Sequence, residues 1–215
     1  MRIVVISDTH GDHADLEVPP ADILVHSGDV ASHGDEQEIL SFLQWFERCE
    51  AKHKIFVAGN HDRFIEAEPD KFRRLLPESV SYLQDSGITI EGIRFWGSPM
   101  TPSFYDWAFM ADLGPQLRAH WELIPADTDI LVTHGPPHGI LDGVNYQGRI
   151  EQAGCPDLRK TVETIKPAFH LFGHIHEGYG RAQHAGVEFV NASCMNEHYR
   201  LTNSASVIDF PAPGT

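Results

Sequence analysis

Eight side chains that commonly bind metal ions stand directly after short apolar stretches of this sequence. They are carboxylates, imidazoles and one amide, namely Asp8, His10, Asp29, Asn60, His61, His134, His174 and His176. Donors of these types suit Mn, Fe or Zn, whereas softer sites prefer thiolates. About eight donors exceed one tetrahedral site and fit two ions roughly 3.5–4 Å apart, an arrangement that stabilises both ends of an in-line phosphoryl displacement. The residue types therefore predict a dinuclear metal centre.

The apolar stretches that precede these side chains are predicted to be buried strands. They span residues 2–6, 23–25, 54–58, 130–132 and 168–172. Near-continuous rather than alternating apolarity is typical of a strand that is covered on both faces. In sheets of this kind the functional groups gather beyond the carboxyl ends of the strands. If the five strands are neighbours, all eight side chains converge on one patch.

Taken singly, each of these positions also has an ordinary structural explanation. Asp8 could cap a turn while His10 is solvated, and Asp29 after Gly28 could belong to a simple turn. His61 could be a buried, hydrogen-bonded core histidine. The repetition of such residues at five strand ends favours metal binding over these explanations.

Five motif blocks carry a resemblance to a known family. They are Asp8-Thr9-His10, Gly28-Asp29, Gly59-Asn60-His61-Asp62, Thr133-His134-Gly135 and Gly173-His174-Ile175-His176. In this order they resemble the signature blocks of the calcineurin-like metallophosphoesterase superfamily. Other stretches resemble its metallophosphoesterase-domain-containing (MPPED-like) branch, which acts on phosphodiesters: Glu91-Gly92-Ile93-Arg94, Trp96-Gly97-Ser98-Pro99, residues 133–137, Gly154-Cys155, residues 176–180 and Asn191-Ala192-Ser193. The resemblance covers nearly the whole chain.

The resemblance implies a fold and a set of ligands. The fold is a four-layer αββα sandwich of two mixed β-sheets flanked by helices, as a single domain over residues 1–215. By matching motif positions, one ion would be held by Asp8, His10, Asp29 and His176, and the other by Asp29, Asn60, His134 and His174. Asp29 would bridge the two ions.

The resemblance also implies a mechanism. A hydroxide that bridges the ions would attack phosphorus in line, and His61 would protonate the departing alkoxide rather than bind metal. Phosphoprotein phosphatases of this superfamily carry an aspartate and an arginine where this chain has Ser32 and His33. This departure argues against a protein phosphatase, and it leaves open which group orients His61.

Three functions fit these observations. The first, favoured by the MPPED-like resemblance and the missing arginine, is a phosphodiesterase that acts on small diesters such as cyclic nucleotides. The second is a phosphomonoesterase that acts on small molecules or phosphoproteins, because it would use the same metals. The third is a non-catalytic protein that binds metal or nucleotide, although every ligand position is occupied by a competent residue.

The remaining elements are predicted from periodicity and turn signals. A helix begins at a cap formed by Asp35 and Glu38, and another ends near residue 76. Further predicted elements are a hairpin of residues 88–90 and 93–96, a short helix through residues 158–165, strands at 186–190 and 205–210, and a tail at 211–215. The stretches 97–115 and 135–156 show no periodicity and are predicted to be long loops beside the site. Asp12 and His13 are predicted to lie in a solvated loop.

Aromatic residues in and beyond the first long loop are candidates for contact with a base or ring of the substrate. They are Phe104, Tyr105 and Trp107, together with Tyr179 between two glycines. Packing of these side chains under the loops is the rival explanation.

The composition limits which binding partners and which cellular compartment we expect. There are 16 basic and 31 acidic residues, which give a net charge of −15 and no basic block, so a nucleic-acid polymer is not expected. Cys49, Cys155 and Cys194 form no C-x-x-C pair and indicate reduced thiols, although the sequence does not exclude a disulfide. No signal peptide or membrane-length apolar run is visible, so we expect a cytoplasmic protein without a membrane partner. The sequence does not fix the oligomeric state, nor which of Mn, Fe or Zn is bound.

Overall fold

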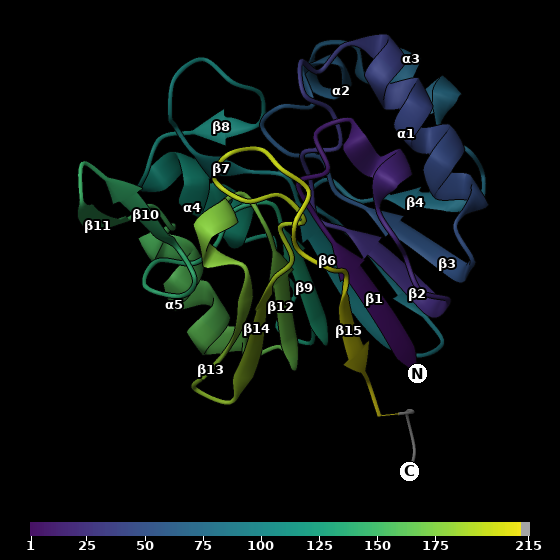
Figure 1. Ribbon diagram of the computed structural model, residues 1–215. Coiled ribbons are helices and arrows are strands. Elements are labelled where there is room, and N and C mark those ends of the chain that lie inside the picture. Colours follow the sequence, from purple (N-terminus) through teal and green to yellow (C-terminus); the bar gives the residue numbers. More distant parts are fainter. Residues whose placement is uncertain (212–215) are drawn as a thin grey trace.

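The computed structural model describes residues 1–211, and its first β-sheet contains the N-terminal strand (Figure 1). The strands of this sheet, in spatial order, are β15 (Ser206–Asp209), β1 (Arg2–Ile6), β2 (Ala21–His26), β3 (Ala51–Phe56) and β4 (Val80–Tyr82). β1 to β4 run parallel, and β15 pairs antiparallel with β1. The parallel strands therefore present their carboxyl ends at one edge.

The second sheet has the same organisation. Its strands, in spatial order, are β13 (Gly180–His184), β14 (Val187–Asn191), β12 (Phe169–Phe172), β9 (Ile130–Thr133), β6 (Ile93–Ser98) and β5 (Ser86–Ile90). The four inner strands are parallel, and the two edge strands are antiparallel to their neighbours. Both sheets are therefore mixed, as expected from the family resemblance.

Alternate residues of β1 pack into different layers of the core. Ile3 and Val5 belong to the apolar cluster between the two sheets, together with residues of β2, β3, β9 and β12. Val4 and Ile6 point the other way, into the cluster under the helices of the first sheet. Because successive side chains of a strand point to opposite faces, a strand with a layer on each side is apolar throughout. This explains the continuous apolar stretches of the sequence.

Helices cover the outer face of each sheet. The first sheet is covered by α1 (Glu36–Arg48), α2 (Arg63–Ala67) and α3 (Pro69–Leu75), and the second by α4 (Pro115–Trp121) and α5 (Pro156–Ile165). The side chain of Asp35 accepts the backbone N–H groups of Gln37 and Glu38, so α1 begins at the predicted capping box. The predicted four-layer αββα sandwich is confirmed.

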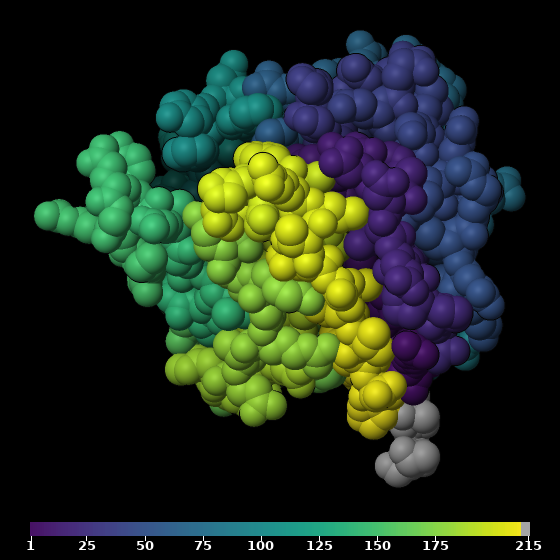
Figure 2. All heavy atoms as spheres, viewed as in Figure 1, coloured from purple at the N-terminus to yellow at the C-terminus, as the bar shows by residue number. Residues whose placement is uncertain are grey.

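The two stretches predicted as long loops contain regular structure. Residues 97–115 hold the short parallel pair β7 (Thr101–Pro102) and β8 (Met110–Ala111) and end where α4 begins. Residues 135–156 contain the antiparallel hairpin of β10 (Gly143–Tyr146) and β11 (Arg149–Gln152), which projects from the body of the molecule (Figures 1 and 2). β11 is exposed along its whole length, so the hairpin has no alternation of buried and exposed residues by which the sequence could have revealed it.

Other expectations need small corrections. β3 begins at Ala51, ahead of the predicted 54–58, because the register of β2 and β3 pairs Ala21 with Ala51. The strands β4 and β13 and the helices α2 and α4 were not predicted. His13 is buried rather than solvated: its ring packs on Trp45 and its Nε2 lies 3.2 Å from Ser41 Oγ. Residues 212–215 of the predicted tail lie outside the described part of the chain.

The cysteines and the helices of residues 1–211 can be compared with what the composition predicts. Cys49, Cys155 and Cys194 are all unpaired. Within this part of the chain, every helix is too short or too polar to cross a lipid bilayer.

Candidate metal centre

The predicted metal-binding side chains follow the carboxyl ends of parallel strands in both sheets. β1 is followed by Asp8 and His10, β2 by Asp29, β3 by Asn60 and His61, β9 by His134, and β12 by His174 and His176. The isolated bridge between Ser7 and Ser193 links the ends of the first and second sheets at this edge. The loops of the two sheets therefore meet at one place.

Six of these side chains form two groups of potential ligands. One group is Asp8, His10 and His176, and the other is Asp29, His134 and His174; within each group the donor atoms lie within 4.8 Å of one another. A third group of His10, Asp29 and His61 overlaps the first two. Clusters of buried histidine and aspartate in this arrangement suit a binuclear metal site.

Asp29 lies between the two groups. Its Oδ2 is 3.3 Å from Nε2 of His134 and 3.8 Å from Nε2 of His10. Its Oδ1 accepts a hydrogen bond of 2.8 Å from the backbone N–H of His61. The amide oxygen of Asn60 lies 3.0 Å from His134 Nε2, on the same side. A carboxylate in this position can contact ions held by either group.

Two of the imidazoles are oriented as ligands by backbone carbonyls. The Nδ1 of His134 lies 3.0 Å from the carbonyl of Ser27, and the Nδ1 of His176 lies 2.9 Å from the carbonyl of Asn196. A carbonyl only accepts, so each Nδ1 carries the proton and each Nε2 is left free to bind a cation. Nε2 of His10 lies 3.3 Å from Nε2 of His176. A shared cation would satisfy this close pair of nitrogens, so the residues present fit a metal.

The charges of the clustered carboxylates and imidazoles balance one another. Burial would raise the pKa of Asp8, but the hydrogen bond and charge of His176 hold it below its usual range. Burial opposes ionisation of Asp29 as well, and His134 holds the pKa of this carboxyl well below normal. In return, and against the effect of burial, the carboxylates raise the pKa values of His134 and His176 to about 9. Cations would replace these protons.

The backbone at the candidate ligands is unusual. Asp8, His10, Asp29 and His174 have φ values of 52°, 40°, 56° and 67°. Non-glycine residues adopt this left-handed region rarely, and such strain concentrates at functional sites. A Cβ at Gly173 would lie 2.1 Å from Asp8 Oδ2, so only glycine allows the loop after β12 to approach this carboxylate.

A backbone carbonyl orients His61. The Nδ1 of His61 lies 2.8 Å from the carbonyl oxygen of Ser32, which leaves Nε2 toward the metal centre. The loop that carries Ser32 is held by the carboxylate of Glu38, which accepts the N–H groups of residues 32–35. The carbonyl therefore takes the place of the aspartate expected in phosphoprotein phosphatases. His33, at the position of their arginine, has a side chain that is 86% exposed.

Two buried residues that the sequence analysis did not single out hold the loops together. Both carboxylate oxygens of Asp62 accept backbone N–H groups, from Gly59 at 2.7 Å and from Val30 and Ala31 at 3.1 and 3.0 Å. Ser193 donates from Oγ to Asp8 Oδ2 at 2.8 Å. Both lie inside the recognised motif blocks, but their contacts depend on residues distant in the sequence.

The predicted substrate-binding aromatics do not form one wall. Phe104 and Tyr105 are 60% and 82% exposed, and their rings lie 4.4 Å apart. Trp107 lies against His61, with ring centroids 4.2 Å apart. Tyr179 donates its hydroxyl proton to the carbonyl of Ser204. Contact of these four side chains with a substrate stays a prediction.

Tyr199 is a further aromatic residue at the site. Its ring centroid is 5.0 Å from those of His10 and His176 and 6.4 Å from that of His61. It lies in the irregular segment between β14 and β15, which is part of the yellow region in Figure 2. This segment has no periodicity or motif that points to the metal centre, so residue type alone did not identify Tyr199.

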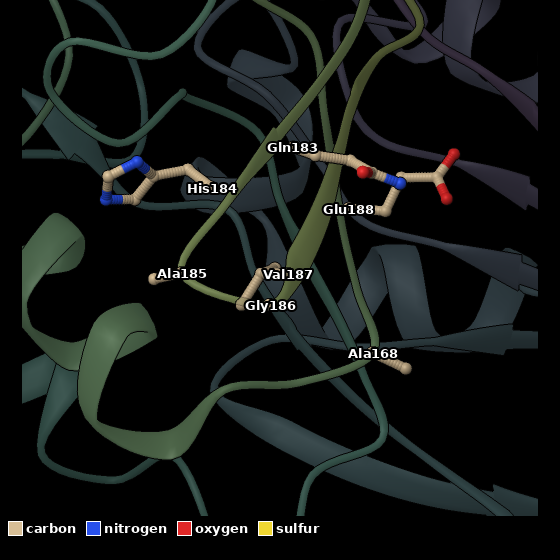
Figure 3. A pocket seen from close by; sticks show the side chains of 7 residues that line it. All are labelled: Ala168, Gln183, His184, Ala185, Gly186, Val187 and Glu188. Carbon is tan, nitrogen blue, oxygen red and sulfur yellow. The ribbon is translucent and has the colours of Figure 1, made fainter.

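A surface hollow of about 350 Å³ lies elsewhere, at the turn between β13 and β14 (Figure 3). Ala168, Gly186 and Val187 contribute to its lining, and the only titratable side chains there are those of His184 and Glu188. β14 runs parallel to β12, so the start of β14 is at the opposite edge from the metal-binding loops. The hollow therefore lies away from the candidate metal-binding residues.

A two-sheet sandwich with paired histidine and aspartate clusters at its strand ends defines the metallophosphoesterase class. The chain belongs to the calcineurin-like phosphoesterase family, which it matches over residues 1–178. The family resemblance seen in the motifs is thereby confirmed.

Several known proteins are similar to most of the chain. Metallophosphoesterase domain-containing protein 1 of Homo sapiens is 37% identical over 99% of this chain and 72% of its own length. A UPF0046 protein of Caenorhabditis elegans is 35% identical over 98% of this chain and 76% of its own length. The crystal structure of TT1561 of Thermus thermophilus covers 88% of both chains with a TM-score of 0.59 and 16% identity, which shows a shared fold.

Proposed function

We propose that the protein is a phosphodiesterase that hydrolyses small phosphodiesters, such as cyclic nucleotides, with two metal ions of the Mn, Fe or Zn type. The observation that carries this proposal is the placement of Asp29 between two groups of inward-facing donors, with His61 beside both. We assign Asp8, His10, Asp29 and His176 to one ion and Asp29, Asn60, His134 and His174 to the other. When bound, the ions would offset phosphoryl charge and make hydroxide available near neutral pH.

His61 is the proposed proton donor to the leaving group. Its Nδ1–H is engaged by Ser32, so only Nε2 can reach a reacting oxygen. An alkoxide leaves poorly without a proton, and a positioned imidazolium supplies one. His61 therefore matters most for diesters whose leaving group is an alkoxide.

The exposed position of His33 favours a diester over a monoester. A phosphomonoester carries a second negative charge, which a gripping arginine would help to neutralise. At this position the chain has a histidine whose side chain is 86% exposed and pairs with Glu38 at 3.5 Å. A diester, with one charge, needs no such group.

We also propose that the protein acts on free small molecules in a reducing compartment such as the cytoplasm. A net charge of −15 disfavours a nucleic-acid polymer as substrate. The three unpaired cysteines are consistent with reduced thiols.

The proposal is tested with metal-stripped protein to which Mn, Fe, Zn, Mg or no metal is added back. We expect metal-dependent hydrolysis of bis-p-nitrophenyl phosphate to exceed that of p-nitrophenyl phosphate, and cyclic nucleotides would then be screened. Preference for the monoester would favour a phosphomonoesterase. Failure to hydrolyse either ester with any metal would favour the non-catalytic binding protein.

A further inference from the structure

The contact between Trp107 and His61 has no part in the function proposed so far. The two rings lie 4.2 Å apart at the centroids with an angle of 30° between their planes. Trp107 is half-buried and lies in the segment between β7 and β8, far from His61 in the sequence. The indole therefore covers the side chain that we assign as the proton donor.

The backbone next to Trp107 is anchored to the metal-binding segment. The N–H of Ala108 donates to the carbonyl of Asn60 at 3.1 Å, and the N–H of Phe109 donates to Glu66 Oε1 at 2.7 Å. The side chain of Phe109 is buried in the core under α1 to α3. These contacts fix the position of the backbone that carries the Trp107 side chain relative to His61.

Arg63 holds the indole itself. Its guanidinium carbon lies 4.6 Å from the ring centroid of Trp107, and the same group donates to the carbonyl of Asp106. A guanidinium over an indole is attracted by the negative face of the ring. Because Arg63 is the first residue of α2, the indole is tied to a helix that begins two residues after His61.

The ring of His61 has few other constraints. Within residues 1–211, its single side-chain hydrogen bond joins Nδ1 to the carbonyl of Ser32. The ring of His10 meets it edge-on at 4.6 Å and 84°, on the side of the metal centre. One hydrogen bond leaves the imidazole free to turn about that bond, whereas an indole packed against the ring at 4.2 Å limits this rotation.

We infer that Trp107 is a positioning residue that holds the plane of the His61 imidazole so that Nε2 faces the leaving group. The inference rests on the proposed role of His61 as proton donor. A displacement of about 1 Å in a catalytic group can cost on the order of 10²-fold in rate, so a loosely held imidazole loses much of its effect.

The first test does not depend on turnover. Histidine ring ¹⁵N spectra of metal-free protein, recorded at a pH at which the imidazole is neutral, report which nitrogen of His61 carries the proton, with the signal assigned from His61→Ala. We expect one Nδ1–H form in the wild type and in Trp107→Phe, and exchange between forms in Trp107→Ala. An unchanged His61 signal in Trp107→Ala would overturn the inference.

The second test compares two diesters, methyl p-nitrophenyl phosphate and methyl phenyl phosphate. Nitrophenolate departs without a proton, whereas phenolate departs more easily with one. We expect Trp107→Ala to lower kcat for the phenyl ester by about 10–100-fold and for the nitrophenyl ester by less than about 3-fold. Trp107→Phe should restore most of the loss. Equal losses on both esters would overturn the inference.

Two controls sharpen this test. Trp45→Ala removes an indole that packs on another histidine, His13, at a centroid distance of 5.2 Å, and should leave both esters unaffected. In a His61→Ala background, Trp107→Ala should have no further effect, since the two residues act as a unit. Additive losses would contradict the inference. If the wild type hydrolyses no diester, the proposed function fails, and the ¹⁵N spectra still decide the role of Trp107.

Discussion

The loops of the two sheets contribute different chemistry to the same site. The first sheet supplies two carboxylates, an amide, one imidazole ligand and the candidate proton donor, from Asp8, Asp29, Asn60, His10 and His61. The second sheet supplies imidazoles alone, from His134, His174 and His176. The negative charge that would offset two cations therefore comes entirely from the first sheet, and the second sheet completes the coordination with neutral donors.

Each sheet also holds the ligands of the other in place. His134 of the second sheet is oriented by the carbonyl of Ser27, which follows β2. Asp8 of the first sheet accepts the N–H of His174 at 3.0 Å and the hydroxyl of Ser193 at 2.8 Å. The site therefore exists only when the two sheets are packed, and its carboxylates and imidazoles can be disturbed separately.

The largest difference between the two sheets is expected from Asp29→Ala and His134→Ala. Asp29→Ala removes a charge that both ions would share, so we expect loss of both metals and of all metal-dependent turnover. His134→Ala removes one neutral donor and should release one ion while the other remains. Elemental analysis after desalting, together with hydrolysis of bis-p-nitrophenyl phosphate, measures both effects.

Asp12→Ala is the matched control for Asp29→Ala. Asp12 is an exposed carboxylate close to His10 in sequence, at the start of a 3-10 helix of residues Asp12–Asp15. We expect it to retain both metals and full activity. Retention of two metals by Asp29→Ala would contradict the bridging position of this carboxylate.

The next largest effect is expected from His61→Ala, which separates chemistry from metal binding within the first sheet. We expect both metals to remain and kcat for alkoxide-leaving diesters to fall by about 10²–10⁴-fold. Esters of p-nitrophenol should lose much less. A normal rate on alkoxide-leaving diesters would reject the role of His61, and loss of metal would make it a ligand.

The ends of the strands could be predicted from the sequence because residue type alone nearly distinguishes the buried strand from the loop that follows it. Ile3 to Ile6 are fully buried, and no polar residue interrupts them until the loop. A carboxylate or imidazole that follows such a strand has few structural reasons to be there. The buried strands and the gathering of candidate ligands beyond their carboxyl ends follow from this contrast between apolar strand and polar loop, whereas the four-layer fold and the division of the ligands into two groups were implied by the family resemblance.

What the sequence did not reveal depends on atoms without a residue signature. The carbonyl of Ser32 orients His61, and every residue type has a carbonyl. Tyr199 reaches the site through a backbone with φ of 54° in an irregular segment. The exposed strand β11 shows no alternation. Such features are set by tertiary contacts and not by local pattern.

The two sheets should also differ in their response to pH. Asp29 and Asp8 oppose the effect of burial and raise the pKa values of His134 and His176 to about 9, from 6.5. A raised pKa means that protonation stabilises the metal-free fold below pH 6.5, and that this contribution is lost as pH rises through about 9. Because a metal must displace these protons, its affinity should rise with pH over the same range.

Calorimetry of Zn or Mn binding to metal-free protein, in buffers of different ionisation enthalpy, measures how many protons are released when the metal binds. Near pH 7.5 we expect the imidazoles of the second sheet to release about two protons per chain, because the carboxylates of the first are already ionised. His134→Asn should release about one proton fewer. A binding enthalpy independent of the buffer would contradict the proton competition.

The smallest effects are expected from a hydrogen bond between a buried histidine and a threonine, which occurs once in each sheet. Nε2 of His26 lies 3.1 Å from Oγ1 of Thr9, and Nε2 of His170 lies 2.8 Å from Oγ1 of Thr133. Burial lowers the pKa of each histidine to about 3, so both are neutral. The N–H of Gly28 donates to His26 Nδ1, and Thr133 donates its own proton to the carbonyl of residue 135. Each Nε2 therefore carries the proton and donates to a threonine beside a candidate ligand.

Thr9→Val and Thr133→Val break these bonds with little change of shape. Each leaves a buried imidazole N–H without its partner, so we expect a loss of about 1–3 kcal/mol in the free energy of unfolding in urea. Thr133→Val should be the more costly because it also removes the bond to the carbonyl of residue 135. Metal affinity should fall by about 10-fold in both, since groups behind the ligands tune their orientation. Equal losses of stability in the two variants would show that the second hydrogen bond of Thr133 contributes nothing, and the two sheets would then support their ligands alike.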